Sequence, residues 1–386
     1  PITNADLKGG IAVSGAGAEY LVANPNNEGA SGFADRNAID PLQQLKALTG
    51  IPSAFTYTPA NSPTGQPVPC LVLSSLPSSG VSPSDATGSA CTAESGLQRS
   101  SGSSMATLTN DRIDKQINYS AVSSSGRLAG GKLYHWDGWI YIPAVDTYTF
   151  RIQHSDAIPD AKISFTLDNS RKTLVDAASF YQGQYYGNMS VVVSPTNDGY
   201  IEGGLKNLQC ANLLTEKPRS EEPTVRCAES PSVGWHKVTL TLDSTGLASN
   251  SELSFRFAYS RTNGDIADAA AAAQGKALAL VFVNDQGRNT VPNQLKLSSL
   301  KPEQLKLIQA VEAKNPNTVV VINTGTPFIV HEWINDINVK AVLNMWQSGQ
   351  EGGTATARLL LGLANPSGHT TMTCPEESTD PIYGYN

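Results

Sequence analysis

Charged side chains are scarce in this chain of 386 residues: they make up 16% of it, against roughly 25% in an average soluble domain. The 27 basic and 34 acidic side chains give a formal net charge of −7, so no positive field attracts a phosphate backbone or anionic lipid. Apolar runs are short as well, and none approaches the ~20 residues of a membrane-spanning helix. We therefore expect no nucleic-acid partner and no membrane span.

Metal-binding motifs are also missing. The sequence has no CxxC or HExxH pattern. Its five histidines are scattered singly along the chain: His135, His154, His236, His331 and His369. A single histidine is far more often a packed or surface residue than a metal ligand. We predict no metal site and no cofactor.

Cysteine is rare, and its spacing is informative. Cys70 and Cys91 bracket a Ser/Gly/Pro-rich loop, Cys210 and Cys227 bracket a polar loop, and Cys374 stands alone. The simplest pairing is two local disulfides and one buried or unpaired thiol, with metal binding as the weaker interpretation. Disulfides persist in oxidising compartments, so this pairing predicts a secreted, extracellular protein.

Two further features agree with secretion. Asn118 and Asn188 each begin a glycosylation sequon, a pattern that also arises by chance. The first residue is Pro1 rather than Met, as expected of a processed or trimmed chain. We predict Asn118 and Asn188 as glycosylation sites.

The outer parts of the chain, residues 1–50 and 267–386, alternate apolar strands with helices. The sequence predicts strands over 11–14, 277–283, 318–322 and 339–343, and helices over 41–48, 268–274, 301–314 and 353–361. Continuously apolar strands that alternate with helices are typical of a mainly parallel sheet covered on both faces. We expect one α/β domain built from both parts.

Between these parts, apolar and polar residues alternate. The alternation predicts strands over 139–142, 148–152, 162–167, 238–242 and 253–259. This is the pattern of an antiparallel β-sandwich, which we place over residues 105–266 as an insertion into the α/β domain. Residues 51–104 are rich in Ser, Pro and Gly and are expected to form an extended, disulfide-stapled connection rather than a helix or core strand. The predicted fold is a mainly parallel α/β sandwich interrupted by an antiparallel β-sandwich.

Four spaced motifs in the last part carry a family resemblance. They are NTVVVINTGTP over 317–327, VKAV over 339–342, WQSGQEGG over 346–353 and ANPSG over 364–368. This succession, with the opening KGGIAVSGAGAE over 8–19, resembles the carboxy-terminal α/β sandwich domain of glycoside hydrolase family 3, the β-glucosidase family. Physically, the motifs supply turns and a helix start, with Glu351 available for the exposed amides of that first helical turn.

The family 3 resemblance implies where catalytic groups belong. Retaining glycosidases need two carboxyl groups across the scissile bond. In family 3 the nucleophilic Asp lies in a preceding barrel domain, which this chain lacks. The acid/base Glu usually follows the strand that corresponds to 277–283. The loop here reads NDQGRNT over 284–290, without Glu.

Within that loop, only one side chain could titrate as an acid. Gln286 cannot donate a proton as an acid and Arg288 stays charged, which leaves Asp285. Asp285 is a weak catalytic candidate, because an aspartate at a strand end is often a turn former. We name Asp285, Gln286, Arg288 and Asn289 as candidate ligand-binding residues.

The middle part resembles the β-sandwich named after the anthrax protective antigen. The residues concerned are HWDGWIYIP over 135–143, DTYTF over 146–150 and GWHKV over 234–238. That module occurs as an insert in family 3 glucosidases and as a glycan-binding head in yeast adhesins. Sugar-binding members carry adjacent acidic residues that hold calcium, whereas Asp156 and Asp160 are separated here, which argues against calcium-dependent binding.

A polar and aromatic segment in the sandwich is a second candidate ligand site. Tyr181, Tyr185 and Tyr186 lie among Gln and Asn residues and can stack on a sugar or another flat ligand. The alternative is a Tyr-rich strand whose rings are shared between core and surface.

Two classes of function follow. The first is a secreted, glycosidase-derived protein without autonomous hydrolase activity, which binds a glycan, a small molecule or copies of itself. The alternative is an enzyme: either a fragment of a family 3 β-glucosidase that works with a barrel domain, or a family 3-like scaffold recruited to a different small-molecule reaction. The absent barrel and the loop without Glu favour the first.

Overall fold

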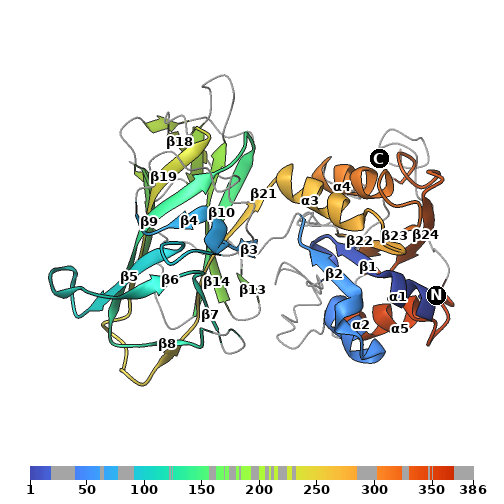
Figure 1. Ribbon diagram of the computed structural model, residues 1–386, viewed down its shortest axis with the longest axis horizontal. Coiled ribbons are helices and arrows are strands. Elements are labelled where there is room, and N and C mark those ends of the chain that lie inside the picture. The colour runs from blue at the N-terminus through green and yellow to red at the C-terminus, as the bar shows by residue number, and fades with distance from the viewer. Residues whose placement is uncertain are drawn as a thin grey trace, which may run out of the picture. The chain divides into compact units, whose positions relative to one another are not determined.

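The computed structural model describes residues 1–18, 40–60, 65–76, 91–120, 123, 125–155, 162–168, 170–173, 180–181, 184–192, 200–204, 208–209, 213–215, 224–227, 232–284, 302–323, 330–346, 348–349 and 351–368. For the strands between 170 and 227 it describes the backbone and its pairing. The chain divides into two compact units (Figure 1). The first comprises Pro1–Pro63 and Thr262–Asn386, and the second comprises Thr64–Arg261.

The first unit is built on a parallel sheet of five described strands in the order β2-β1-β22-β23-β24. The strands are β1 Ile11–Ser14, β2 Phe55–Thr58, β22 Leu278–Asn284, β23 Thr318–Asn323 and β24 Val339–Asn344. β1, β22 and β23 are buried along almost their whole length, which explains their continuous apolar runs. The predicted parallel α/β architecture is confirmed.

Helices cover both faces of this sheet (Figure 1). They are α1 Asn4–Gly9, α2 Pro41–Thr49, α3 Gly264–Ala273, α4 Pro302–Glu312 and α5 Gly352–Leu360. Successive strand residues face opposite sides, so the sheet has two cores. Val281 packs with residues of α3 and α4 on one face, and Leu280 packs with residues of α2 and α5 on the other.

Gly15, directly after β1, shows how tightly this sheet edge is packed. Its φ is +91°, and an added Cβ would lie 2.0 Å from the carbonyl oxygen of Phe282 on the neighbouring strand. Only glycine fits both the backbone conformation and the space. The chain can therefore leave β1 directly against β22.

The second unit consists of antiparallel sheets. One contains the path β17-β18-β15-β14-β10-β21-β3, with β13 beside β14 and β7 beside β21. Another contains β16-β12-β11-β19-β9-β5-β6, with β4 beside β9, and β8 pairs with β20. The strands are β3 Gln66–Pro67, β4 Leu73–Ser74, β5 Leu97–Gly102, β6 Thr109–Asp114, β7 Asn118–Tyr119, β8 Leu128–Ala129, β9 Leu133–Ile142, β10 Thr147–Ser155, β11 Ile163–Leu167, β12 Ser170–Thr173, β13 Phe180–Tyr181, β14 Gln184–Val192, β15 Tyr200–Gly204, β16 Leu208–Gln209, β17 Leu213–Thr215, β18 Thr224–Cys227, β19 Gly234–Asp243, β20 Glu252–Leu253 and β21 Phe255–Arg261.

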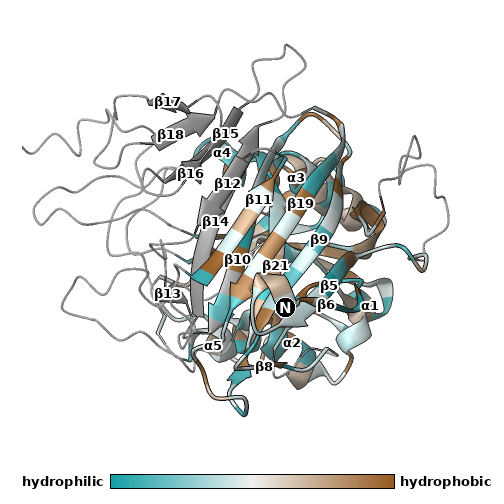
Figure 2. Cartoon of the chain, turned by 90° about the vertical axis from the view of Figure 1, so that its left-hand side faces the viewer, coloured by the Kyte–Doolittle hydropathy of each residue, from teal (hydrophilic) through white to brown (hydrophobic). Residues whose placement is uncertain are grey.

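A single aromatic-rich core joins the two larger sheets. The ring centroids of Phe150 on β10 and Phe165 on β11 are 5.6 Å apart, and those of Trp136 on β9 and Phe255 on β21 are 5.0 Å apart. Residues along β9, β19 and β11 alternate in hydropathy, and these three strands lie side by side (Figure 2). The predicted antiparallel β-sandwich is confirmed as part of the fold.

In the described parts of residues 51–104, where an extended connection was expected, the structure has strands of both units. β2 forms an edge of the parallel sheet, and β5 pairs with both β6 and β9 in the sandwich. Leu73 and Leu97 are buried in the sandwich core. Composition was misleading here because the backbone hydrogen bonds of neighbouring strands hold a Ser-rich segment that has little β propensity of its own.

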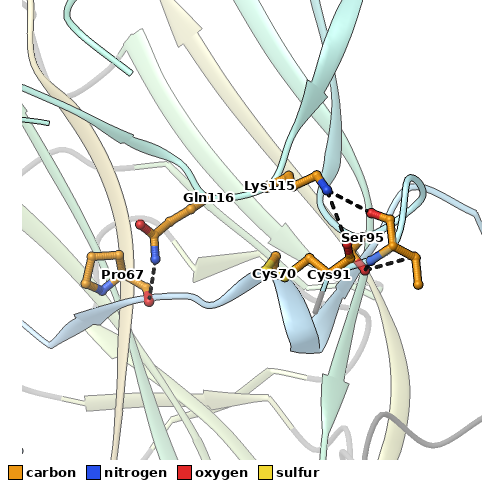
Figure 3. The surroundings of a disulfide bond; sticks show 7 residues. Pro67, Cys70, Cys91, Ser95, Lys115 and Gln116 are labelled. Carbon is orange, nitrogen blue, oxygen red and sulfur yellow. Dashed lines mark hydrogen bonds between the residues drawn. A yellow bond between two sulfur atoms is a disulfide. The ribbon is translucent and has the colours of Figure 1, made fainter. Parts of the chain in front are cut away.

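A disulfide joins Cys70 to Cys91, with their Cα atoms 5.9 Å apart. Lys115 reinforces this crosslink, since its Nζ donates to the carbonyl oxygens of Cys91 at 3.3 Å and Thr92 at 3.1 Å (Figure 3). Cys210 and Cys374 lie outside the described residues, and Cys227 is described as a backbone position on β18. The expected pairing of Cys210 with Cys227 therefore stays a prediction.

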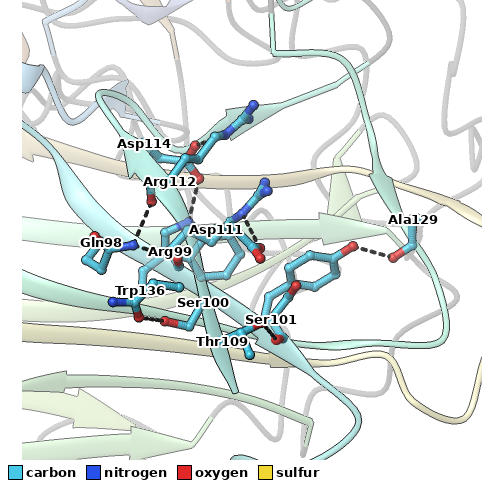
Figure 4. Close-up of polar contacts among 12 residues, drawn as sticks. Gln98, Arg99, Ser100, Ser101, Thr109, Asp111, Arg112, Asp114, Ala129 and Trp136 are labelled. Atoms are coloured by element: carbon cyan, nitrogen blue, oxygen red, sulfur yellow. Dashed lines mark hydrogen bonds and ion pairs between the residues drawn. The ribbon is translucent and has the colours of Figure 1, made fainter. Parts of the chain in front are cut away.

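A buried carboxylate on β6 connects that strand to β7 and β9 of the sandwich (Figure 4). Asp114 at the end of β6 is 5% exposed and accepts hydrogen bonds from Tyr119 and from Trp136 Nε1, the latter at 2.8 Å. Arg112 pairs with the other carboxylate oxygen at 2.7 Å. Arg112 and Arg99 both donate to the Tyr119 hydroxyl at 3.0 Å. Burial and the Asp114 charge raise the pKa of Tyr119 to about 12, so the phenol stays protonated.

Candidate functional site at the carboxyl ends of the parallel strands

Polar residues end four neighbouring strands of the parallel sheet. Ser14 ends β1, Asn284 ends β22, Asn323 ends β23 and Asn344 ends β24. Asn284 is directly opposite Asn323, and Asn344 is opposite Ile322, so the three amides lie within neighbouring rows of the sheet. Ligands of open α/β sheets bind beyond the carboxyl ends of the strands. This edge is the candidate functional site.

Asn284 is fixed by a side chain from helix α4. Its backbone N–H donates to Gln304 Oε1 at 2.8 Å, and Gln304 Nε2 donates to its carbonyl oxygen at 2.8 Å. Gln304 is 5% exposed and Asn284 is 2% exposed, so both bonds are shielded from water. The pairing of β22 with β1 ends at Val281. The side-chain amide of Gln304 therefore provides hydrogen-bond partners for the backbone of Asn284, and it fixes the point where the next loop begins.

The other two asparagines hold the turn after β24. Asn323 Nδ2 donates to the carbonyl oxygen of Trp346 at 2.6 Å, and the backbone N–H of Trp346 donates to Asn344 Oδ1 at 3.1 Å. Trp346 has a φ of +51°, a conformation that costs a non-glycine residue about 1–3 kcal/mol. The two asparagine bonds stabilise this backbone at the sheet edge.

Three polar atoms near this edge are buried without a hydrogen-bond partner among the described residues. They are Ser14 Oγ, Asn284 Nδ2 and Ser348 Oγ. A buried and unpaired polar group costs about 1–3 kcal/mol, so such atoms are suited to a ligand or to water. Hydroxyl and amide groups bind polar neutral ligands such as sugar hydroxyls, but they cannot act as general acids near neutral pH.

The loop candidates begin where this edge ends. Asp285, Gln286, Arg288 and Asn289 follow Asn284 directly and lie outside the described residues. The structure places the start of their loop at the carboxyl edge. The catalytic role considered for Asp285 stays a prediction. Sequence reasoning missed Ser14, Asn284 and Gln304, although a polar residue that ends an apolar strand is a usable signal.

The three tyrosine candidates lie on paired strands of the sandwich. Tyr181 is on β13, and Tyr185 and Tyr186 are consecutive on β14. The register pairs Tyr181 with Gln184 and Tyr185 with His154. Because strand positions alternate between faces, Tyr181 and Tyr186 belong to one face and Tyr185 to the other. Gln182 lies outside the described residues, and ligand binding by this segment stays a prediction.

The remaining sequence candidates occupy varied positions. Asn118 is half-buried on β7 opposite Arg256, and Asn188 is a backbone position on β14 opposite Arg151. Glu351 is the N-cap residue of α5, but its exposed side chain makes no capping hydrogen bond, so the expected contact with the helix amides is absent.

His236 on β19 is buried between two acceptors. Its Nδ1 is 2.6 Å from Asp168 Oδ2, and its Nε2 is 2.7 Å from the carbonyl oxygen of Ser232. Burial lowers the pKa of His236, but the hydrogen bonds to Asp168 and Ser232 outweigh it and raise the pKa above 6.5. Acceptors face both ring nitrogens, an arrangement that favours the doubly protonated ring.

Glu312 at the end of α4 is a second buried ionisable group. It is 8% exposed, and its Oε2 has no hydrogen-bond partner in the described residues. Burial and the nearby Asp336 raise the pKa of Glu312 to about 7. Asp336 belongs to the turn before β24 and accepts from the backbone N–H of Asn338 at 2.8 Å. This carboxyl pair lies at the amino ends of the strands, away from the candidate site.

Neither a metal cluster nor a membrane helix is found within the described ranges. They contain no group of three or more His, Cys, Asp or Glu side chains placed to hold an ion. They also contain no helix that is long and apolar enough to cross a membrane.

Comparison with known families identifies the fold. The sequence pattern of the glycosyl hydrolase family 3 C-terminal domain matches residues 5–385. The chain belongs to this family. The match spans both units of the family 3 chain, so the sandwich lies inside the matched region.

Curated relatives of the family 3 chain are β-glucosidases, matched over limited stretches. A β-glucosidase of Rhizobium radiobacter is 39% identical over 128 residues, which cover 32% of this chain and 15% of that protein. Probable β-glucosidase F of Aspergillus flavus is 36% identical over 111 residues, which cover 27% and 13%. β-Glucosidase B of Emericella nidulans is 44% identical over 82 residues, which cover 21% and 9%. The matches thus span less than a sixth of each of these three relatives.

Solved β-glucosidases also align with the family 3 chain. The enzyme of Streptomyces venezuelae, in complex with D-glucose, aligns with 98% of this chain and 37% of its own, at 23% identity and a TM-score of 0.42. The enzyme of Kluyveromyces marxianus, in complex with glucose, aligns with 98% and 41%, at 16% identity and a TM-score of 0.44.

Proposed function

We propose that this chain is the carboxy-terminal part of a family 3 β-glucosidase and that it contributes one wall of the active site without hydrolysing glucosides alone. The family match over residues 5–385 carries the proposal, and the curated relatives named β-glucosidase support it. The carboxyl edge of the parallel sheet is the wall concerned. Its asparagine and serine groups suit sugar hydroxyls.

The requirement for two carboxyl groups supports the lack of autonomous hydrolysis. Retaining glycosidases place a nucleophile and an acid/base about 5–5.5 Å apart across the scissile bond. At the described part of the carboxyl edge, the strand-ending residues Ser14, Asn284, Asn323 and Asn344 supply no carboxyl group. Asp285 is the nearest sequence candidate for one of the two, and the nucleophile is expected from a barrel domain outside this chain.

A binding-only protein is the second candidate function. It is favoured by the loop over 284–290, which lacks the Glu that family 3 acid/base catalysis uses. In this proposal the carboxyl edge holds a glycan or small molecule, or the chain associates with itself. Extracellular location is part of both proposals, because the Cys70–Cys91 disulfide suits an oxidising compartment.

The two candidates separate in an activity assay on the chain joined behind a family 3 barrel domain. We expect measurable hydrolysis of an aryl β-glucoside by the joined protein, lost in Asp285→Asn and kept in Glu332→Gln, an exposed control in the same unit. A well-folded joined protein without activity would support the binding-only function. Reading the transcript upstream of Pro1 provides an independent check, because an encoded barrel supports the glucosidase proposal.

A further inference from the structure

Gln304 is a buried polar side chain on the sheet-facing side of α4. It lies on the same helix face as Leu307, Ile308 and Val311, at the spacing of residues that pack on a sheet. Gln304 is 5% exposed, and burying an amide costs free energy unless its polar atoms are hydrogen-bonded. An amide at this position therefore needs partners inside the fold.

Both polar atoms of Gln304 bind the backbone of Asn284. Gln304 Oε1 accepts from the N–H of Asn284, and Gln304 Nε2 donates to its carbonyl oxygen, each at 2.8 Å. We call these two hydrogen bonds the Gln304 clamp. Two bonds to one residue fix both its position and its orientation. Since both reach the main chain, the clamp acts on the path of the backbone whatever side chain is present at 284.

The clamp holds a strand end that projects beyond its neighbour. β1 pairs with β22 only as far as Val281, whereas β23 pairs with β22 as far as Asn284. In the described part of the sheet, the last residues of β22 thus have a strand partner on one side only. Strand ends with few backbone partners open locally at little cost in free energy, so the clamp provides support that β1 does not give.

Helix α4 gives the clamp a rigid base. Leu307 and Ile308 are fully buried and belong to the same core as Val281 and Val283 of β22. Cores of this kind are close-packed, so helix and strand are fixed relative to each other. Gln304 and Asn284 therefore cannot separate without disturbing that core.

The clamped residue is where the candidate site begins. Asn284 Nδ2 is buried without a hydrogen-bond partner among the described residues, and Asp285, the catalytic candidate, follows in the sequence. The Asn284 carbonyl shares one planar peptide group with the nitrogen of Asp285. The hydrogen bond from Gln304 Nε2 therefore acts directly on the peptide group that leads to Asp285.

We propose that Gln304 is a positioning residue of the family 3 active site, which sets the backbone at Asn284 so that Asn284 and Asp285 meet the substrate in a productive orientation. This inference rests on the proposed function and adds to it a residue that touches no substrate itself. A displacement of about 1 Å at a reacting group can cost roughly 100-fold in rate. Loss of the clamp should therefore lower turnover more than substrate binding.

Gln304→Met in the chain joined behind a family 3 barrel domain tests the proposal. Methionine has a similar length and suits apolar surroundings, but its thioether cannot replace the hydrogen bonds of the amide. We expect kcat for an aryl β-glucoside to fall by about tenfold to a hundredfold, with KM within about threefold of the parent value. Gln309→Met, at an exposed position of the same helix, is the matched control and should keep the parent kcat.

Gln304→Glu tests the clamp within one variant by changing only the pH. A protonated carboxyl can accept from the Asn284 N–H and donate to its carbonyl oxygen, whereas a carboxylate can only accept. The kcat of this variant should approach the parent value at low pH and fall as pH rises through the pKa of the new carboxyl, which burial raises. Gln309→Glu, measured at each pH, provides the reference profile and should show no added titration.

Unfolding and kinetics together separate positioning from a merely structural role. Each rate is divided by the folded fraction, measured by thermal unfolding at the same pH. A fall in kcat that disappears after this correction would overturn the proposal. A parent kcat in Gln304→Met, or a change in KM alone, would overturn it as well.

A failure of the proposed function gives a different result. If the joined parent protein does not hydrolyse the glucoside at all, the proposed function is wrong and the positioning role is wrong with it. An active parent protein whose Gln304 variants keep the parent kcat overturns the positioning role alone.

Discussion

At the scale of single residues, His236 makes the stability of the sandwich depend on pH. Its imidazole ring lies between Asp168 and the Ser232 carbonyl, and Asp168 also accepts from the backbone N–H of Lys237 at 2.9 Å. Asp168 has a φ of +48°, which is unusual for a residue other than glycine. The hydrogen bonds between β19 and Asp168 thus stabilise an unfavourable turn after β11.

The raised pKa of His236 predicts how the stability of the sandwich changes with pH. The folded state holds its proton more tightly than the unfolded state, whose histidine has a pKa near 6.5. This contribution is complete below that value and is lost as pH rises through the folded pKa. We expect the free energy of unfolding of the sandwich, measured by urea denaturation, to decrease as pH rises above about 6.5.

His236→Gln should flatten that pH dependence, because glutamine does not titrate. His331→Gln, at an exposed position in the other unit, should retain the parent slope. An equal slope in the parent chain and in His236→Gln would contradict the assignment.

At the scale of elements, Asp114 ties β6 to β9. Asp114→Asn removes the charge that Arg112, Tyr119 and Trp136 share. We expect a loss of about 2–4 kcal/mol in the free energy of unfolding, since three partners of a buried carboxylate are weakened together. Chemical denaturation followed by tryptophan fluorescence measures it.

Asp111→Asn is the matched control for Asp114→Asn. Asp111 pairs with Arg99 at 3.1 Å with a more exposed side chain, so its loss should cost less than about 1 kcal/mol. Similar losses in both variants would show that the buried network is not the cause.

The Glu312–Asp336 pair joins α4 to the turn before β24. The pKa of Glu312 is raised to about 7 from an ordinary value of 4.5, so its proton stabilises the fold at low pH. That contribution is complete below the unfolded pKa and is lost as pH rises through 7, where two carboxylates face each other. We expect Glu312→Gln to slow amide exchange in β24 at pH 8 relative to the parent chain, with little difference at pH 5.

The exposed Glu332→Gln in the same turn serves as the control for that comparison. Faster exchange of β24 in Glu312→Gln than in the parent chain at pH 8 would show that the glutamate stabilises the turn as an anion.

Elements with strong local signals were predictable from sequence, and those held by their neighbours were not. The apolar runs of β22 and β23 and the helix α2, with Asp40 before it and Gly50 after it, agree with the predictions. Helix α1 is missing from the predictions because it is only six residues long, although Thr3 and Asp6 form a capping box. β2 and β5 form because they pair with neighbouring strands, and amino-acid composition does not predict such pairing.

At the scale of the whole molecule, the sequence was enough to recognise the family. It was enough to locate only part of the candidate site. The motifs over 317–368 resemble family 3, and the family match covers residues 5–385. The strand that precedes the 284–290 loop was located, but the Asn284–Gln304 contact joins residues 20 positions apart. Such a contact depends on how α4 packs on the sheet, which the local pattern does not encode.

Family membership also sets the expectation for activity. The matched stretches cover 15% of the Rhizobium relative and 13% of the Aspergillus relative, so most of those proteins lies outside the similarity. A glycosidase site needs two carboxyl groups, and we expect this chain to supply at most one of them. Cooperation with another domain is therefore the central claim of the proposed function.

The most direct test measures hydrolysis of an aryl β-glucoside by the purified chain alone and by the chain joined behind a family 3 barrel domain. We expect no turnover by the chain alone, turnover by the joined protein, and loss of that turnover in Asp285→Asn but not in Glu332→Gln. Hydrolysis by the chain alone at a rate that Asp285→Asn leaves unchanged would contradict the proposed function.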